Sequence, residues 1–216
     1  MVPGLEAGIS GVASTLRNEP VQARSAARLA ALLDATAGVL DEVGYERLTT
    51  AMIAERAGAS IGTVYRYFPD RLAVLQALGR RNLASFQAEL GERFADDAPK
   101  HWSAVFDALL ELLERRFAEV PGFRSVRFGD VIDLGLHGER AQGGDALAGQ
   151  LAELMAASGL TDDRDLRFRA RYALQIAESG LTLAFSGPNR GQEEFRNGAI
   201  RTTGANLTGY FTHFYA

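Results

Sequence analysis

Cysteine is absent from this chain of 216 residues, and lysine occurs only once, at Lys100, among 23 basic residues. Without cysteine the chain forms neither disulfides nor thiolate metal sites, so a reducing, cytoplasmic location is the simplest expectation. The chain also lacks any apolar run near the roughly 20 residues of a membrane span, so we expect no membrane partner. Residues 1–20 have no basic start followed by a long apolar core, and we interpret them as a flexible tail.

The motifs of common enzymes and metal proteins are also missing. The sequence contains no nucleophile elbow, no phosphate-binding loop and no His-Glu-x-x-His zinc motif. His101, His137 and His213 stand apart, without acidic residues at metal-ligand spacing. We therefore predict no catalytic residue, no metal and no cofactor, and an all-α enzyme remains an alternative with no motif behind it.

No segment alternates apolar and polar residues between turn signals, as a half-buried strand does. Apolar residues instead recur every three or four positions, which predicts an all-α chain. Residues 122–144 are irregular and leave room for a short helix and a loop. The predicted helices cover residues 22–43, 50–57, 61–68, 70–94, 100–119, 145–158, 162–186 and 192–215.

Charge gives little indication of a partner. The net charge is −4, which does not point to nucleic acid. Between residues 21 and 81 eight arginines face six acidic residues. This mild basic excess does not establish DNA binding by itself.

The stretch AERAGASIGTVYRYFPDR, residues 54–71, predicts two helices joined by a tight turn at Gly58. Ser60 is a suitable N-cap for a second, very short helix over 61–68. That helix has Gly62 in its first turn and is rich in aromatic residues, so its helix propensity is low. A helix–turn–helix that reads DNA has this shape, although an ordinary pair of helices with exposed tyrosines fits the spacing equally well.

Residues 31–78, ALLDATAGVLDEVGYERLTTAMIAERAGASIGTVYRYFPDRLAVLQAL, resemble the N-terminal domain of TetR-type bacterial transcriptional regulators. The family usually has lysine where this chain has Arg71, and commonly an acidic residue where it has Leu72. The resemblance implies a helix-turn-helix DNA-binding domain at 21–70, with 61–68 as recognition helix, and a helical ligand-binding and dimerisation domain at 71–216. The DNA contacts that it implies are Thr49, Thr50, Ser60, Gly62, Thr63, Tyr65, Arg66, Tyr67 and Arg71.

The resemblance further implies a homodimer on a near-palindromic double-stranded DNA operator, released when a small molecule binds the second domain. Repression is the family's usual outcome, and activation stays open. A dimeric helical adaptor without DNA binding is the alternative from another class. Arg66 either reads a guanine edge or lies in solvent.

Small residues at alternating three- and four-residue spacing mark the last two predicted helices, and no charged residue follows Arg201. Helices with such seams approach closely, so we predict that they form the dimer interface, with one thick core as the alternative. The predicted interface residues are Ala170, Ala173, Ala177, Gly180, Ala184, Gly198, Thr202, Ala205 and Gly209.

A pocket for a hydrophobic effector would be lined by apolar side chains with a few polar ones. Ordinary core packing is the alternative for each candidate. Glu178, alone in an apolar stretch, either anchors the effector or pairs with an arginine across the dimer. The candidates are Phe86, Leu90, Trp102, Phe106, Phe123, Phe128, Tyr172, Gln175 and Glu178.

Overall fold

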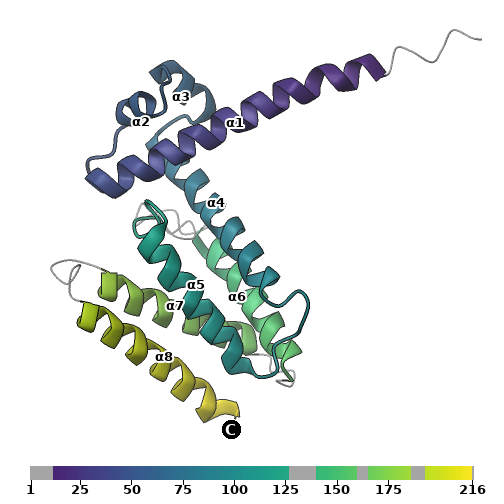
Figure 1. The fold of residues 1–216 in the computed structure, drawn as a ribbon, viewed down its shortest axis with the longest axis vertical. Coiled ribbons are helices and arrows are strands. Elements are labelled where there is room, and N and C mark those ends of the chain that lie inside the picture. The colour runs from purple at the N-terminus through teal and green to yellow at the C-terminus, as the bar shows by residue number, and fades with distance from the viewer. Residues whose placement is uncertain (1–11, 127–139, 160–164, 186–192, 216) are drawn as a thin grey trace, which may run out of the picture.

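The computed structural model describes residues 12–126, 140–159, 165–185 and 193–215, and all regular structure in these ranges is α-helical. The helices are α1 (Val12–Val43), α2 (Thr50–Arg56), α3 (Ile61–Tyr67), α4 (Arg71–Glu92), α5 (Trp102–Glu119), α6 (Arg140–Ala157), α7 (Leu166–Phe185) and α8 (Glu193–Tyr215). Figure 1 shows α1–α3 as one unit, from which α4 leads to the bundle of α5–α8. The predicted all-α fold, with an N-terminal helix-turn-helix and a C-terminal helical domain, is confirmed.

Side-chain caps set the starts of the two helices of the helix-turn-helix. The hydroxyl of Thr49 accepts from the amide of Met52 at 3.2 Å and starts α2. Ser60 Oγ accepts from the amide of Thr63 at 3.1 Å and starts α3. Each cap satisfies a backbone donor that a helix start leaves free.

The start of α4 is capped in the same way, since Asp70 Oδ1 accepts from the amide of Ala73 at 2.8 Å. By residue type alone, Thr50 competes with Thr49 as the cap of α2, and Pro69 competes with Asp70 as the start of α4. The structure selects Thr49 and Asp70, and places α3 one residue shorter than predicted.

Two helices extend further than the sequence indicates. α1 begins at Val12, where the predicted helix begins at Gln22, and α6 begins at Arg140 instead of Asp145. The two predicted helices begin only after Pro20 and after the glycine pair 143–144. Proline and glycine weaken a helix, but neither always ends one, and here both helices continue through them. None of the described helices is long and apolar enough to cross a membrane.

Two hydrophobic cores divide the chain, and α4 contributes to both. Its first half places Val74, Leu75 and Leu78 in the core formed with α1–α3. Its second half places Phe86 and Leu90 in the core formed with α5–α8. A rotation or tilt of α4 therefore changes the packing of both units.

A second link between the cores is the turn at residues 121–126, directly after α5. Phe123 lies in the core of α5–α8, whereas Val126 lies in the core of α1–α3. The buried Asn82 of α4 donates from Nδ2 to the carbonyl of Val126 at 2.6 Å, which holds the turn against α4. Gly122 lies directly on the backbone of Ala37 in α1.

The Gly122→Ala substitution should destabilise the protein more than Gly44→Ala. Gly122 and Gly44 have nearly the same φ, +71° and +76°, which costs a residue with a Cβ about 1–2 kcal/mol. A Cβ at Gly122 would lie 2.9 Å from the carbonyl oxygen of Ala37, whereas one at Gly44 would meet nothing within 4 Å. The clash should add about 1–3 kcal/mol.

Denaturant unfolding of the two variants measures this difference. Gly44→Ala is the matched control because it carries the dihedral strain without the clash. Equal losses in the free energy of unfolding would show that the turn does not press on α1.

Candidate nucleic-acid interface

The outer face of α3 is open to solvent. Val64 is fully buried and anchors α3 in the first core, which α1–α3 form with the first half of α4. Around it Ile61, Gly62 and Tyr65 are exposed, with 51% of the Tyr65 surface accessible. The sequence therefore folds a short helix whose outer face is available for contact.

Hydroxyl groups from α2 and α3 meet at this surface. The hydroxyls of Tyr65 and Thr50 lie 3.2 Å apart, and those of Ser60 and Thr63 lie 2.9 Å apart. The structure thus brings four of the predicted contact residues into two adjacent pairs. Hydroxyls in such pairs are oriented by each other, and they suit phosphate oxygens.

Tyr67 and Arg66 turn toward α1. The hydroxyl of Tyr67 lies 3.3 Å from Ser25 Oγ of α1, and its ring is half-buried. The guanidinium carbon of Arg66 lies 5.5 Å from the centre of the Tyr67 ring, a cation–π distance. Both residues therefore line the space between α3 and α1, next to the exposed face of α3.

Arg71 has a role that its sequence position does not suggest. It is half-buried, and its Nη1 donates to the carbonyl of Leu48 at 3.1 Å and to that of Tyr45 at 3.4 Å. Its guanidinium carbon also lies 4.8 Å from the centre of the Tyr45 ring. Arg71 thus ties the start of α4 to the connection between α1 and α2, and only part of its fork faces outward for the predicted phosphate contact.

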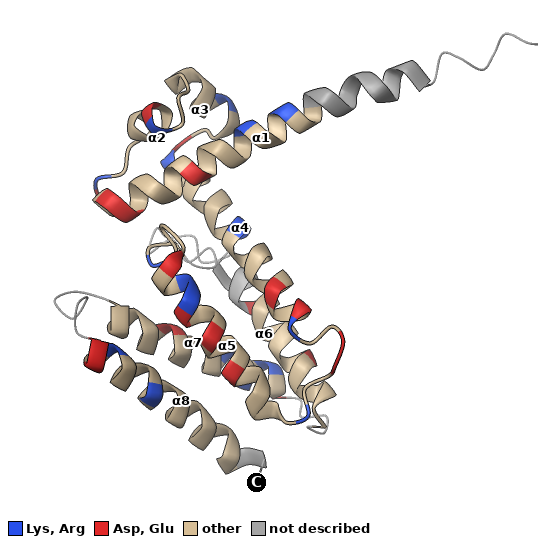
Figure 2. Ribbon diagram, viewed as in Figure 1, with Lys and Arg blue, Asp and Glu red and all other residues tan. Residues whose placement is uncertain are grey.

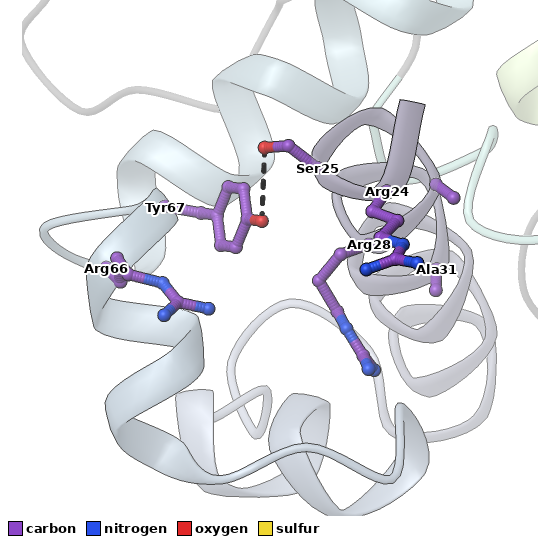
Figure 3. A pocket seen from close by; sticks show the side chains of 7 residues that line it. Arg24, Ser25, Arg28, Ala31, Arg66 and Tyr67 are labelled. Carbon is purple, nitrogen blue, oxygen red and sulfur yellow. Dashed lines mark hydrogen bonds between the residues drawn. The ribbon is translucent and has the colours of Figure 1, made fainter. Parts of the chain in front are cut away.

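An open groove of about 690 Å³ separates α1 from α3, and the sequence patterns do not identify it. Figure 3 shows that Arg24 and Arg28 of α1 and Arg66 of α3 line it. The only signal in the sequence is the four-residue spacing of Arg24 and Arg28, which puts both on one face of a helix. The groove is lined by Arg24, Ser25, Ala27, Arg28, Ala31, Arg66 and Tyr67.

An ion pair orients α2 against α1. Arg56 Nη2 donates to Glu42 Oε2 at 2.5 Å. This hydrogen bond lowers the pKa of the Glu42 carboxyl and raises that of Arg56, and the opposite charges act in the same direction. Because the pKa of Glu42 is lowered, the contribution of the pair is present at neutral pH and is lost as the pH falls through that pKa.

Most of the predicted effector-binding residues lie in the second core, which α5–α8 form with the second half of α4. Phe86, Leu90, Trp102, Phe106 and Phe123 are all buried there. The ring centres of Trp102 and Phe106 are 6.0 Å apart, so these side chains pack on one another. The groove between α1 and α3, the two grooves beside α4 that face α5 or α6, and the groove near residues 93–111 are lined by other residues.

The other four candidates are scattered. Phe128 lies outside the described residues. Tyr172 and Gln175 are exposed on the outer side of α7, and Glu178 is buried on its inner side. The structure therefore groups the first five candidates and separates Tyr172 and Gln175 from them.

The small-residue seam predicted on α7 lies inside the chain. Ala170, Ala173, Ala177 and Ala184 are buried in the second core. A Cβ on Gly180 would lie only 2.0 Å from Thr203 Oγ1 of α8. The spacing that predicts a close approach thus serves packing within one chain, and the four alanines are not open to a second copy.

The predicted residues of α8 have the opposite exposure. Thr202, Ala205 and Gly209 are exposed, and a Cβ on Gly198 or Gly209 would meet nothing within 4 Å. This face of α8 carries no charge after Arg201 (Figure 2). It is therefore open to another helix.

The outer face of α7 carries large apolar residues that the small-residue pattern does not select. Phe168 is 68% exposed and Leu183 is 56% exposed, with the exposed Tyr172 between them. The Tyr172 ring lies 5.0 Å from that of Tyr210 in α8. Helical periodicity is the signal that could have found this second stripe, whereas the small residues mark the other face.

Within the described residues no group of three or more metal-ligating side chains lies close enough to hold a metal ion.

Two family models match the chain. Residues 32–78 match the model described as bacterial regulatory proteins, tetR family, and residues 100–203 match the tetracyclin repressor-like C-terminal domain. The helix-turn-helix and the α5–α8 bundle therefore each have a counterpart.

Curated relatives match over a smaller part of the chain. The HTH-type transcriptional repressor KstR of Mycolicibacterium smegmatis is 46% identical over 50 residues, 23% of this chain and 24% of that protein. The regulator BetI of Burkholderia mallei is 40% identical over 75 residues, 34% of this chain and 38% of that protein. The matched part thus spans 24% and 38% of the length of these two relatives.

Solved structures match over most of the chain. RolR in complex with resorcinol has a TM-score of 0.53 at 23% identity, over 88% of this chain and 93% of that one, and it supports the fold alone. A TetR-family transcriptional regulator from Streptomyces coelicolor has a TM-score of 0.70 at 30% identity, over 86% of this chain and 98% of that one. Matched at both of its domains and over nearly the whole of that regulator, the chain belongs to the TetR family of bacterial regulatory proteins.

Proposed function

We propose that the protein is a transcriptional repressor that binds a near-palindromic operator as a homodimer and leaves it when a small hydrophobic effector binds. The observation that carries the proposal is the exposed face of α3, with Tyr65 open to solvent and Val64 anchoring the helix from behind. A dimer would present two such helices to successive major grooves, about 34–36 Å apart. We place the DNA-binding domain at residues 21–70 and the effector and dimer domain at 71–216.

The proposed DNA contacts are those that the helix-turn-helix leaves accessible. Gly62 lets the backbone of α3 approach the duplex closely, because it has no side chain. The paired hydroxyls of Thr50 and Tyr65 would hold phosphate oxygens at the edge of the groove. The other proposed contacts are Thr49, Ser60, Thr63, Arg66, Tyr67 and Arg71.

The effector would act through the two links between the cores. A ligand among the aromatic side chains of the second core would displace Phe123, and with it the turn that presses Gly122 on α1. The tilt of α4 would change at the same time. A ligand that binds one separation of the α3 helices better than the other shifts the equilibrium, with a coupling of about 1–3 kcal/mol.

Selection from random duplex DNA tests operator binding. We expect the protein to enrich a palindrome, with affinity falling about 10³-fold or more between 50 and 200 mM salt. Tyr65→Ala should abolish enrichment while circular dichroism stays that of a folded helical protein, and Tyr65→Phe should keep part of it. A flat salt response with no enriched sequence would contradict the proposal.

The dimer is proposed to form through the outer face of α7 and the uncharged face of α8. Phe168→Glu with Leu183→Glu should convert the dimer to a monomer in sedimentation, because two carboxylates would be desolvated in the interface. Operator affinity should fall with it, since a monomer holds one half-site.

Ala118→Glu is the matched control, because it adds a carboxylate to an exposed position of α5. It should leave the mass unchanged. A double α7 variant that remains a dimer would place the interface elsewhere.

Trp102 offers a direct measurement of effector binding because it is the only tryptophan in the chain. Its ring lies 5.6 Å from Phe211 and 6.0 Å from Phe106, inside the proposed binding region. Aromatic or acyl compounds that release the operator should therefore change the emission of Trp102. A compound that releases the operator without changing it would move the effector site out of the second core.

A further inference from the structure

We infer that the groove between α1 and α3 binds the sugar-phosphate backbone of duplex DNA, and that Arg66 contacts phosphate there and does not read a base. The inference rests on the proposed DNA binding and deepens it. It assigns Arg24 and Arg28 to the DNA interface. For Arg66 the sequence leaves open a contact with a guanine edge or a place in solvent, and the inference gives it a phosphate contact instead.

The groove is lined by basic side chains that have no acidic side chain beside them in its lining. Its lining holds three arginines and no acidic side chain. Two other arginines in the first half of the chain have acidic partners: Arg56 pairs with Glu42, and Arg81 pairs with Asp34 at 2.5 Å. Among the described residues no carboxylate forms an ion pair with a groove arginine. A polyanion is the occupant that this charge distribution fits.

The part of α1 that forms the groove is exposed on all sides. Every residue from 22 to 30 is exposed, so this segment buries no side chain against the described part of the chain. Four alanines in it maintain the helix by propensity. Arg24 and Arg28, four residues apart, repel each other on one face. A phosphate between them would remove that repulsion, which gives a reason for the placement.

The groove continues the proposed recognition surface. Arg66 and Tyr67 form its wall on α3, the helix that also exposes Gly62 and Tyr65. The hydrogen bond between Tyr67 and Ser25 holds the two walls together. In Figure 3 the guanidinium groups of Arg66 and Arg28 extend into the space between the helices.

A duplex seated on α3 would therefore pass its backbone along this groove, since the two surfaces share a helix. Arginine forks match phosphate oxygens in pairs, and such contacts set the position of a protein on DNA without reading its sequence. The groove is more open than enclosed, which suits a continuous strand better than a free mononucleotide.

The double variant Arg24→Ala/Arg28→Ala tests the groove in the full-length protein bound to its selected operator. We expect the slope of log affinity against log salt to become shallower by about 0.9 for each phosphate that is no longer neutralised, and the affinity to fall at least about tenfold. The enriched sequence should stay the same. Arg93→Ala, which removes an exposed arginine at the end of α4, is the matched control and should change neither slope nor affinity.

An unchanged salt slope in the double variant would overturn the inference while leaving the proposed function intact. Arg66→Ala should likewise weaken all sequences equally, and loss of preference for a guanine at one operator position would assign Arg66 to a base instead. Competition by inorganic phosphate or ATP beyond the effect of ionic strength would show a free-anion site and overturn it as well. A wild-type protein that selects no DNA would overturn the proposed function together with the inference.

Discussion

The division of α4 between two hydrophobic cores is the constraint on which the rest of this structure depends. Val74 and Leu78 belong to the unit that presents α3, whereas Phe86 and Leu90 belong to the bundle. A helix packed on both sides cannot tilt without repacking one of them, because protein interiors are close-packed. The turn at 121–126 is a second connection between the two units, because it packs in both cores.

Much of the fold follows from local patterns in the sequence. Glycines with positive φ end helices at Gly44, Gly58 and Gly159, where the patterns predict that they stop. The N-caps Ser60 and Asp70 are also predictable from residue type. Such signals lie within a few residues of the helix end that they determine, so a single sequence is sufficient to find them.

The parts that could not be predicted depend on contacts distant in sequence. The spacing of Ala173, Ala177 and Gly180 indicates a close helix contact, but it does not say whether the partner is α8 of the same chain or a second copy. The approach of Gly180 to Thr203 decides it. Arg24 and Arg66 are also far apart along the chain, and only the fold places them across one groove. The contact of Phe123 and Val126 with different cores has the same origin.

The packing of α7 on α8 within one chain has a consequence for how subunits meet. Because Gly180 packs on Thr203 of the same chain, α7 and α8 form a helical hairpin within one subunit, and the proposed dimer would join two such hairpins. Assembly is then the docking of two preformed surfaces and needs no exchange of segments between chains. If the protein dimerises as proposed, its subunits would exchange partners without unfolding, and an inactive copy would enter mixed dimers with the active one.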